Sequence, residues 1–236
     1  MKTVLLLIFF SAGLFASAQR TINVDDSSKF TNSILYFNSG SGIPYVLSKY
    51  AKIVEGSVFI PESLSPAQIY IKGIDKALNN VLARLNIVDN QLNYFDEVKG
   101  IELTAVDPIS EVRFKDSVSG EIRIFTRSIA NCAHTRPGWY EMLESGKLSL
   151  YRQVIKKITE TKPYGSATSE QRVETFFSYW IQAGEDCRAV KKISELANYI
   201  VEVDPELKSK LPQRKLYDKK EEDWIELAKL YNSSHQ

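Results

Sequence analysis

The sequence predicts an α+β fold in which an antiparallel, hairpin-rich β body, sandwich- or barrel-like, is followed by a C-terminal cap of two or three helices. Three observations predict it. Apolar and polar residues alternate with a period of two through the middle of the chain, turn signals interrupt this alternation at short intervals, and a helical period replaces it after Val190. The chain therefore divides into a signal peptide over 1–18, a flexible polar lead-in over 19–44, a β-rich domain over 45–190 and a helical segment over 191–236.

The first eighteen residues have the pattern of a secretory signal peptide. Lys2 supplies a positive start, a mostly apolar run extends from Val4 to Phe15, and Ala16-Ser17-Ala18 offers the small side chains that signal peptidase accepts. Cleavage between Ala18 and Gln19 is therefore expected. The alternative is a retained membrane anchor, but a spanning helix needs about 20 apolar residues and this run is shorter. The sequence thus predicts a secreted or periplasmic protein with no integral membrane segment after cleavage.

The charge balance argues against strongly charged partners. The chain has 30 Lys and Arg residues and 29 Asp and Glu residues, and removal of the signal peptide takes away Lys2 alone, so 30 − 1 = 29 basic residues face 29 acidic ones. A chain without net charge has no global field that attracts nucleic acid or an anionic membrane. The 236 − 18 = 218 residues of the mature chain are enough to bury a substantial core.

Strand segments follow from the period-two alternation. Residues 81–88 alternate up to the turn signal Asp89-Asn90, and 173–181 alternate up to the turn at 183–186. Glu144-Ser145-Gly146-Lys147 has the composition of a tight hairpin between two further strands. Shorter strands are predicted at 92–95, 101–104, 112–114, 121–126, 140–143, 148–154 and 187–190.

Helices are predicted after Val190. Apolar residues recur at helical spacing in two stripes, the first formed by Ile193, Leu196, Ala197, Ile200 and Val201 and the second by Trp224, Leu227, Ala228 and Tyr231. Asp204-Pro205 is typical of a helix start, because an N-cap residue precedes a proline at the first helical position. Asp218 with Glu221 three residues later predicts a capping box at the start of the last helix.

Cys132 and Cys187 are the two cysteines of the chain. In an oxidising compartment an even pair is open to bridging, and closing a loop of this length would stabilise the fold by roughly 4 kcal/mol. The alternative is two buried thiols that never meet, because sequence alone does not place two Cα atoms within reach. A catalytic thiol is the least favoured interpretation, since His134 is the one base nearby in the sequence.

Trp139 and Tyr140 are the candidate ligand-binding aromatics. They follow a Pro-Gly turn, where exposed rings would stack on sugars or flat ligands. The sequence favours the alternative, a role in the core, because a large anchor is common at the start of a strand.

The sequence contains few residues in patterns typical of metal or cofactor sites. His134 and His235 are the two histidines, and the C-x-H spacing from Cys132 to His134 lacks the paired ligands typical of zinc sites. A G-x-S-x-G elbow and a P-loop are both missing from the sequence. No catalytic residue, cofactor or metal is therefore expected.

Paired carboxylates are the enzymatic alternative that the residue inventory leaves open. Glycosidases need two carboxylates on one cleft, and Asp96, Glu97, Glu141 and Glu144 lie on or beside predicted strands. Acidic residues near turns are more often solvated surface residues.

A family resemblance is carried by short motifs. The segment 140–151 resembles a recurring "EVL-x-x-GK-x-x-L-x-K" hairpin, and 86–94 resembles an "N-x-x-x-N-x-L-x-F/Y" strand pair, while 107–109 and 220–223 fit the same group. Together they are similar to uncharacterised exported proteins of Bacteroidota, with departures at 61–80 and in the cysteine pair. This group has no assigned activity, so the resemblance implies a compartment and an architecture but no site residues.

These observations favour a non-catalytic exported protein, either a binding module or an accessory protein of the cell envelope. A glycan, a small molecule or an envelope protein is the kind of partner expected. The alternatives are a secreted carboxylate-based hydrolase and a carrier of lipids or small molecules, which a closed apolar cavity would mark.

Overall fold

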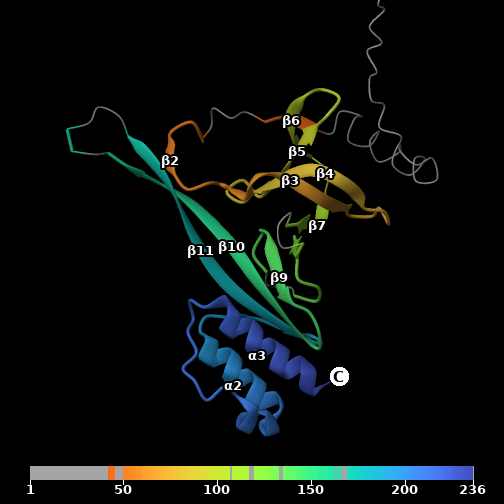
Figure 1. Cartoon of the computed structure of the whole chain (residues 1–236), viewed down its shortest axis with the longest axis vertical. Coiled ribbons are helices and arrows are strands. Elements are labelled where there is room, and N and C mark those ends of the chain that lie inside the picture. The colour runs from red at the N-terminus through yellow and green to blue at the C-terminus, as the bar shows by residue number, and fades with distance from the viewer. Residues whose placement is uncertain are drawn as a thin grey trace, which may run out of the picture.

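The described strands join in one open sheet that ends in a helical cap (Figure 1). The computed structural model describes residues 42–45, 50–106, 108–116, 120–132, 135–162, 164–165 and 169–235. The predicted signal peptide, its cleavage pair Ala18 and Gln19, and nearly all of the predicted lead-in lie outside these ranges. The last residues of the lead-in, Gly42–Pro44, form the short strand β1.

The described strands are β1 (Gly42–Pro44), β2 (Ile53–Glu55), β3 (Phe59–Ile71), β4 (Leu78–Asn86), β5 (Gln91–Asp96), β6 (Ile101–Ala105), β7 (Ile109–Lys115), β8 (Ile122–Thr126), β9 (Tyr140–Glu144), β10 (Leu148–Thr161), β11 (Glu170–Ala183) and β12 (Asp186–Val190). The strands from β4 to β12 lie near the segments that the alternation predicts, whereas β1, β2 and β3 were not predicted. The helical elements are α2 (Ile193–Val203), the 3₁₀ helix η2 (Pro205–Lys210) and α3 (Glu221–Ser234). The α+β order, with helices after the strands, is confirmed.

The sheet has the order β1-β6-β5-β4-β3-β7-β8-β9-β10-β11-β12, and β2 pairs with β11 outside this path. From β7 to β12, described strands that are neighbours in sequence are also neighbours in space, as hairpin turns dictate. This path runs from β1 to β12 and does not return to its start. The sheet is therefore open, and the sandwich- or barrel-like form expected from the sequence is not seen in the hydrogen-bonded order.

One face of β3 to β8 carries the first core. Cross-strand partners such as Leu85 and Leu92, or Tyr94 and Leu103, stand on this face, as the period of two requires. Trp139 also packs into this core. The polar residues between these positions point to the other face, where Arg84 forms an ion pair with Glu102 at 2.7 Å.

The helical cap forms a second core against β10, β11 and β12. Its buried residues include Leu148, Leu150, Ile181 and all four members of the predicted stripe on α3. Trp224 stacks on Tyr179 with ring centroids 4.1 Å apart. Among the described helices, none is long and apolar enough to cross a membrane.

The two predicted helix starts have different outcomes. Asp204 caps η2 by accepting a hydrogen bond from the Glu206 amide at 3.0 Å, with Pro205 first in the helix, as predicted. The predicted capping box on α3 is wrong, because α3 begins after Lys220, which makes no side-chain cap. The Asp218 carboxylate instead accepts from the Ile193 amide at 2.7 Å and so caps α2.

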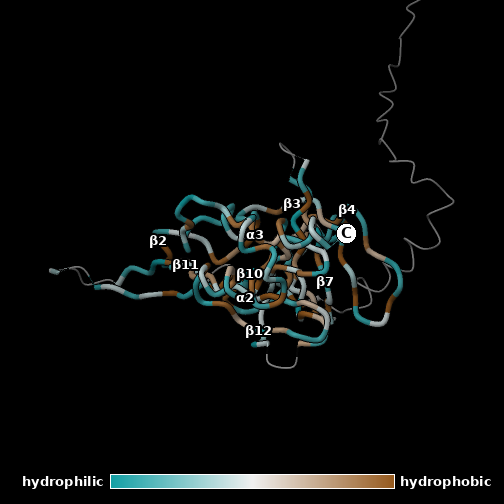
Figure 2. The backbone as a smooth tube through the Cα atoms, turned by 90° about the horizontal axis from the view of Figure 1, so that it is seen from below, coloured by the Kyte–Doolittle hydropathy of each residue, from teal (hydrophilic) through white to brown (hydrophobic). Residues whose placement is uncertain are grey.

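The hairpin of β10 and β11 is much longer than its neighbours. Each strand has 14 residues in an uninterrupted antiparallel register. One end of the hairpin packs under the helices, and the other projects from the body as an arm (Figure 1). Figure 2 shows the same arm reaching away from the rest of the chain.

Candidate functional site: the open edge of strand β11

The predicted ligand-binding aromatics are inside the protein. Trp139 and Tyr140 both have 0% exposure. Tyr140 packs edge-on against Trp180 in a third cluster and donates its hydroxyl hydrogen bond to the Arg136 carbonyl at 2.7 Å. Neither ring offers a face to a ligand, so the core role that the sequence favoured is the one they have.

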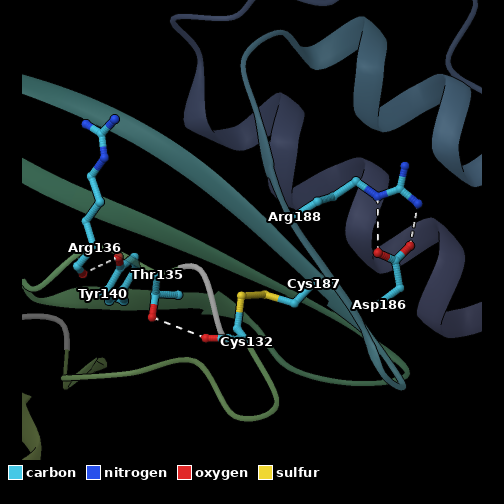
Figure 3. Close-up of a disulfide and its surroundings, with 7 residues drawn as sticks. All are labelled: Cys132, Thr135, Arg136, Tyr140, Asp186, Cys187 and Arg188. Carbon is cyan, nitrogen blue, oxygen red and sulfur yellow. Dashed lines mark hydrogen bonds and ion pairs between the residues drawn. A yellow bond between two sulfur atoms is a disulfide. The ribbon is translucent and has the colours of Figure 1, made fainter.

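The two cysteines meet as a disulfide. It joins the connection between β8 and β9 to β12, with Cα atoms 5.3 Å apart (Figure 3). Cys132 and Cys187 both pack against the cluster of Ile129, Tyr140, Tyr151 and Trp180. The bridge therefore holds the connection over the aromatic rings and helps to keep Tyr140 buried.

Of the four carboxylates that the hydrolase alternative considers, Glu141 and Asp96 are tied into structural contacts, Glu144 lies 3.5 Å from the Asn232 side-chain amide, and Glu97 is exposed. Glu141 is buried and accepts hydrogen bonds from Arg123 and Arg152, both at 2.6 Å. Burial opposes its ionisation, but the Arg123 hydrogen bond and the two guanidinium charges outweigh burial and lower the pKa of the Glu141 carboxyl. A general acid needs a raised pKa. Asp96 closes the β5–β6 turn by accepting from the amides of Val98 and Lys99.

Metal-binding side chains do not converge in the described part of the chain. Its His, Cys, Asp and Glu residues form no group of three or more that would hold an ion. His134 lies outside the described residues. His235 stacks on Tyr231, and its Nε2 lies 3.4 Å from the Asp204 carboxylate.

A groove of about 630 Å³ lies between the hairpin turns and the helical cap. It is open to solvent, and its lining combines Lys147, Ser149 and Gln182 with the helix residues Tyr199, Val203 and Tyr231. A carrier of apolar molecules would enclose its ligand in an apolar cavity. This groove does not have that form.

The outer edge of β11 has a different character, because two short strands occupy its ends and leave its middle open. β2 runs parallel to the edge at Gln171 and Arg172, and β12 runs antiparallel to it from Tyr179 to Ala183. No described strand pairs with this edge between Arg172 and Tyr179. We call residues 173–178 the edge window.

The hydrogen-bond directions in the edge window follow from one contact. The Gln171 amide donates to the Lys52 carbonyl of the segment leading into β2 at 3.0 Å, so it points away from β10. Backbone groups alternate sides along a strand, and the β10–β11 register has no irregularity. Odd-numbered residues of β11 therefore direct their N–H and C=O groups to the outer edge.

Gly56 narrows the window at the end occupied by β2. A Cβ atom on Gly56 would lie 2.8 Å from the Val173 carbonyl oxygen, and the φ of Gly56 is 79°. Only glycine combines this backbone conformation with so close an approach. Among the described residues, the N–H and C=O groups of Thr175 and Phe177 are the ones left open to a partner.

β2 is held beside the arm by Lys156 of β10. Its ammonium donates to the carbonyls of Ser57 at 2.7 Å and Phe59 at 2.8 Å. Burial lowers the pKa of Lys156, and the two carbonyls offset that cost by accepting from the charged form. The chain between β2 and β3 is thereby tied across the arm, which fixes how far β2 covers the edge.

Two phenylalanines stand on opposite faces of the edge window. Phe176 is 45% exposed and Phe177 is 52% exposed. The Lys157 ammonium lies 5.4 Å from the Phe176 ring centroid, and the Arg152 guanidinium carbon lies 4.8 Å from that of Phe177. The cation beside each ring covers part of the ring face. The ring edges remain available for contact with a partner.

Together these features can bind an extended segment. Unpaired N–H and C=O groups on a strand edge accept another strand through main-chain hydrogen bonds, and apolar residues on both faces cover alternate side chains of the added segment. The signal that could have pointed to this site is the adjacent pair Phe176 and Phe177 within a predicted strand, because neighbouring residues on a strand lie on opposite faces. The gap between β2 and β12 has no sequence signal, because it depends on where two distant short strands end.

Comparisons with known proteins do not assign a function to the edge window. No family model, no curated protein and no solved structure matches the chain.

Proposed function

We propose that this protein is a non-catalytic binding protein, exported to the periplasm or beyond, that recognises an extended segment of another envelope protein by strand addition to β11. The observation that carries the proposal is the edge window, where the outward backbone groups of Thr175 and Phe177 pair with no described strand between β2 and β12. Main-chain hydrogen bonds provide affinity in this mode of recognition.

The window limits the length of the added segment. β2 and β12 occupy the same edge on either side, so a long strand in this position would collide with one of them. At roughly 3.3 Å per residue, the space fits a segment of about four or five residues. A second copy of β11 is too long to enter, so the protein is not expected to dimerise through this edge.

The side chains around the window favour a segment with aromatic or branched apolar residues. Arg172 is paired with Glu55, and Lys157 lies opposite Glu174 in the β10–β11 register. The local charges therefore compensate one another and provide no strong preference for a charged partner. Contacts with the rims of Phe176 and Phe177 would then select the partner.

Export and the disulfide are consistent with this role. Disulfides persist in oxidising compartments outside the cytoplasm, and Cys132 and Cys187 are bridged. The expected signal peptide would deliver the protein to such a compartment.

Amide hydrogen exchange tests the site directly. In the free protein, the amides of Thr175 and Phe177 are expected to exchange much faster than those of Phe176 and Ser178, which point to β10. Heptapeptides selected from a random phage-displayed library against residues 19–236 serve as the probe. Binding is expected to protect the Thr175 and Phe177 amides and to enrich alternating apolar positions in the peptides.

A pair of variants separates backbone recognition from other effects. Thr175→Pro removes an outward N–H while leaving the ladder to β10 intact, which edge strands tolerate, and it is expected to weaken peptide binding at least tenfold. Thr175→Val keeps the N–H and is expected to bind as the wild type does. Equal binding by both variants, or loss of binding only after substitution of Tyr199 in the groove, would show that the edge window is not the site. Turnover of a glycan, ester or peptide by the purified protein would refute the non-catalytic role.

A further inference from the structure

Arg127, which directly follows β8, differs from the other arginines of the described ranges. Every described arginine other than Arg127 and the exposed Arg136 forms an ion pair with a carboxylate. The pairs are Arg84–Glu102, Arg113–Glu111, Arg123–Glu141, Arg152–Glu141, Arg172–Glu55, Arg188–Asp186 and Arg214–Asp223. Arg127 is half-buried, and its guanidinium has neither a hydrogen bond nor an ion pair with any residue that the structure describes.

The guanidinium rests on a rigid support. Its central carbon lies 4.1 Å from the Trp139 ring centroid, and Trp139 has no exposure. The Trp139 indole N–H is also buried without a hydrogen-bond partner. A flat cation stacked on a fixed ring has little freedom left to lose when it binds a ligand.

No carboxylate of the described residues compensates the charge of Arg127. Burial lowers the pKa of Arg127, and no described carboxylate counteracts that shift. Burying a charge without a partner costs free energy, so this residue weakens the fold where an apolar residue would not. Such a cost is typical of residues that serve binding and not stability.

We propose that the Arg127 guanidinium is a binding point for the carboxylate group of a ligand, supported from behind by the Trp139 ring. A guanidinium binds a carboxylate through two parallel N–H···O hydrogen bonds, and the Arg127 guanidinium donates no hydrogen bond to a described residue that would compete with this contact. One cation balances one negative charge. A phosphate group would call for a second cation, and none of the described residues provides one beside Arg127.

The arginine side-chain N–H signals in a ¹H–¹⁵N NMR spectrum provide the test. Sodium acetate is titrated into the full mature protein at constant ionic strength, with sodium chloride and inorganic phosphate in parallel titrations. The signal missing from Arg127→Met identifies Arg127 Nε–H, and that signal is expected to shift saturably with acetate. The signal of the exposed Arg136 serves as the internal control and is expected to show at most a small, non-saturating shift.

Variants distinguish a binding role from a structural one. Arg127→Met keeps a long side chain on Trp139 and is expected to melt at the wild-type temperature or above it, because it removes an unpaired charge. Acetate is expected to raise the melting temperature of the wild type and of Arg136→Met, but not that of Arg127→Met. Arg127→Lys keeps the charge without the planar fork and is expected to bind acetate at least fivefold more weakly.

Three results would overturn the proposal. The first is an Arg127 Nε–H shift with acetate that does not saturate or does not exceed the shift with chloride. The second is saturation by phosphate and not by acetate. The third is a large fall in the melting temperature of Arg127→Met, which would assign the cation a structural partner.

Discussion

Glu141 sits at the centre of an ion network that joins the sheet to the helical cap. Arg123 of β8 and Arg152 of β10 both pair with it, and Arg152 also pairs with Glu221 at the start of α3. The Glu141 side chain is 5% exposed and that of Arg152 is 14% exposed. At this depth the partners depend on one another, because an uncompensated buried charge costs far more than a missing surface pair.

Arg152→Met is expected to lower the free energy of unfolding by about 3 to 5 kcal/mol, because it leaves Glu141 with one cation and Glu221 with none from the network. Urea denaturation at pH 7 measures the loss. The double variant Arg152→Met, Glu141→Leu is expected to recover part of it, since the buried carboxylate is gone. A double variant whose loss equals the sum of the two single losses would mean that the two residues are not coupled.

The stability provided by Glu141 is expected to depend on pH in a defined direction. Its folded pKa lies below the ordinary value of 4.5, so its contribution is present above about pH 4.5 and is lost as the pH falls through the folded pKa. Glu141→Gln should therefore be less stable than the wild type at pH 7 by more than it is at pH 3. A difference that stays constant between the two pH values would argue against the ion network.

The disulfide acts at the scale of elements, because it ties the β8–β9 connection to β12 across a separation of 55 residues. The double variant Cys132→Ser, Cys187→Ser is expected to lower the free energy of unfolding by about 4 kcal/mol, because the unfolded chain is no longer restricted by the cross-link. Denaturant unfolding with and without reductant measures this cost. The double variant is the control, since its stability should not respond to the reductant; a wild type equally stable in both conditions would contradict the prediction.

Helix boundaries also depend on neighbouring elements. Asp204 caps η2 in the way its own sequence predicts, since donor and acceptor lie two residues apart. Asp218 carries an equally clear local signal but caps α2, 25 residues earlier in the chain. A capping carboxylate accepts from whichever free helix N–H groups the fold brings closest, and local sequence does not contain that information.

At the scale of the whole molecule, each of the three buried clusters contains one tryptophan. Trp139 lies in the first core, Trp224 in the second and Trp180 in the cluster beside the disulfide. The strands from β7 to β12 are consecutive neighbours in the sheet and contribute residues to all three clusters. This continuity favours cooperative unfolding.

Three variants that each keep one tryptophan, with the other two replaced by phenylalanine, test this cooperativity. In each variant the fluorescence and far-ultraviolet circular dichroism midpoints are expected to coincide in urea. The circular dichroism curve of the same variant is the reference, so that the stability cost of the substitutions cancels. A lower fluorescence midpoint for the variant that keeps Trp224 would mean that the helical cap unfolds as a separate unit.

Local sequence predicted the strands from β4 onward, the helical stripes and the change from strands to helices after Val190, because periodicity and turn composition are local properties of the chain. It also identified Cys132 and Cys187 as potential partners. Four features depend on contacts between distant segments: the sheet stays open, Trp139 and Tyr140 are buried, the cysteines meet, and β2 and β12 leave a gap on β11. Hydrophobic alternation does not predict these contacts. It determines which face of a strand is buried, but it does not determine which distant segment covers that face.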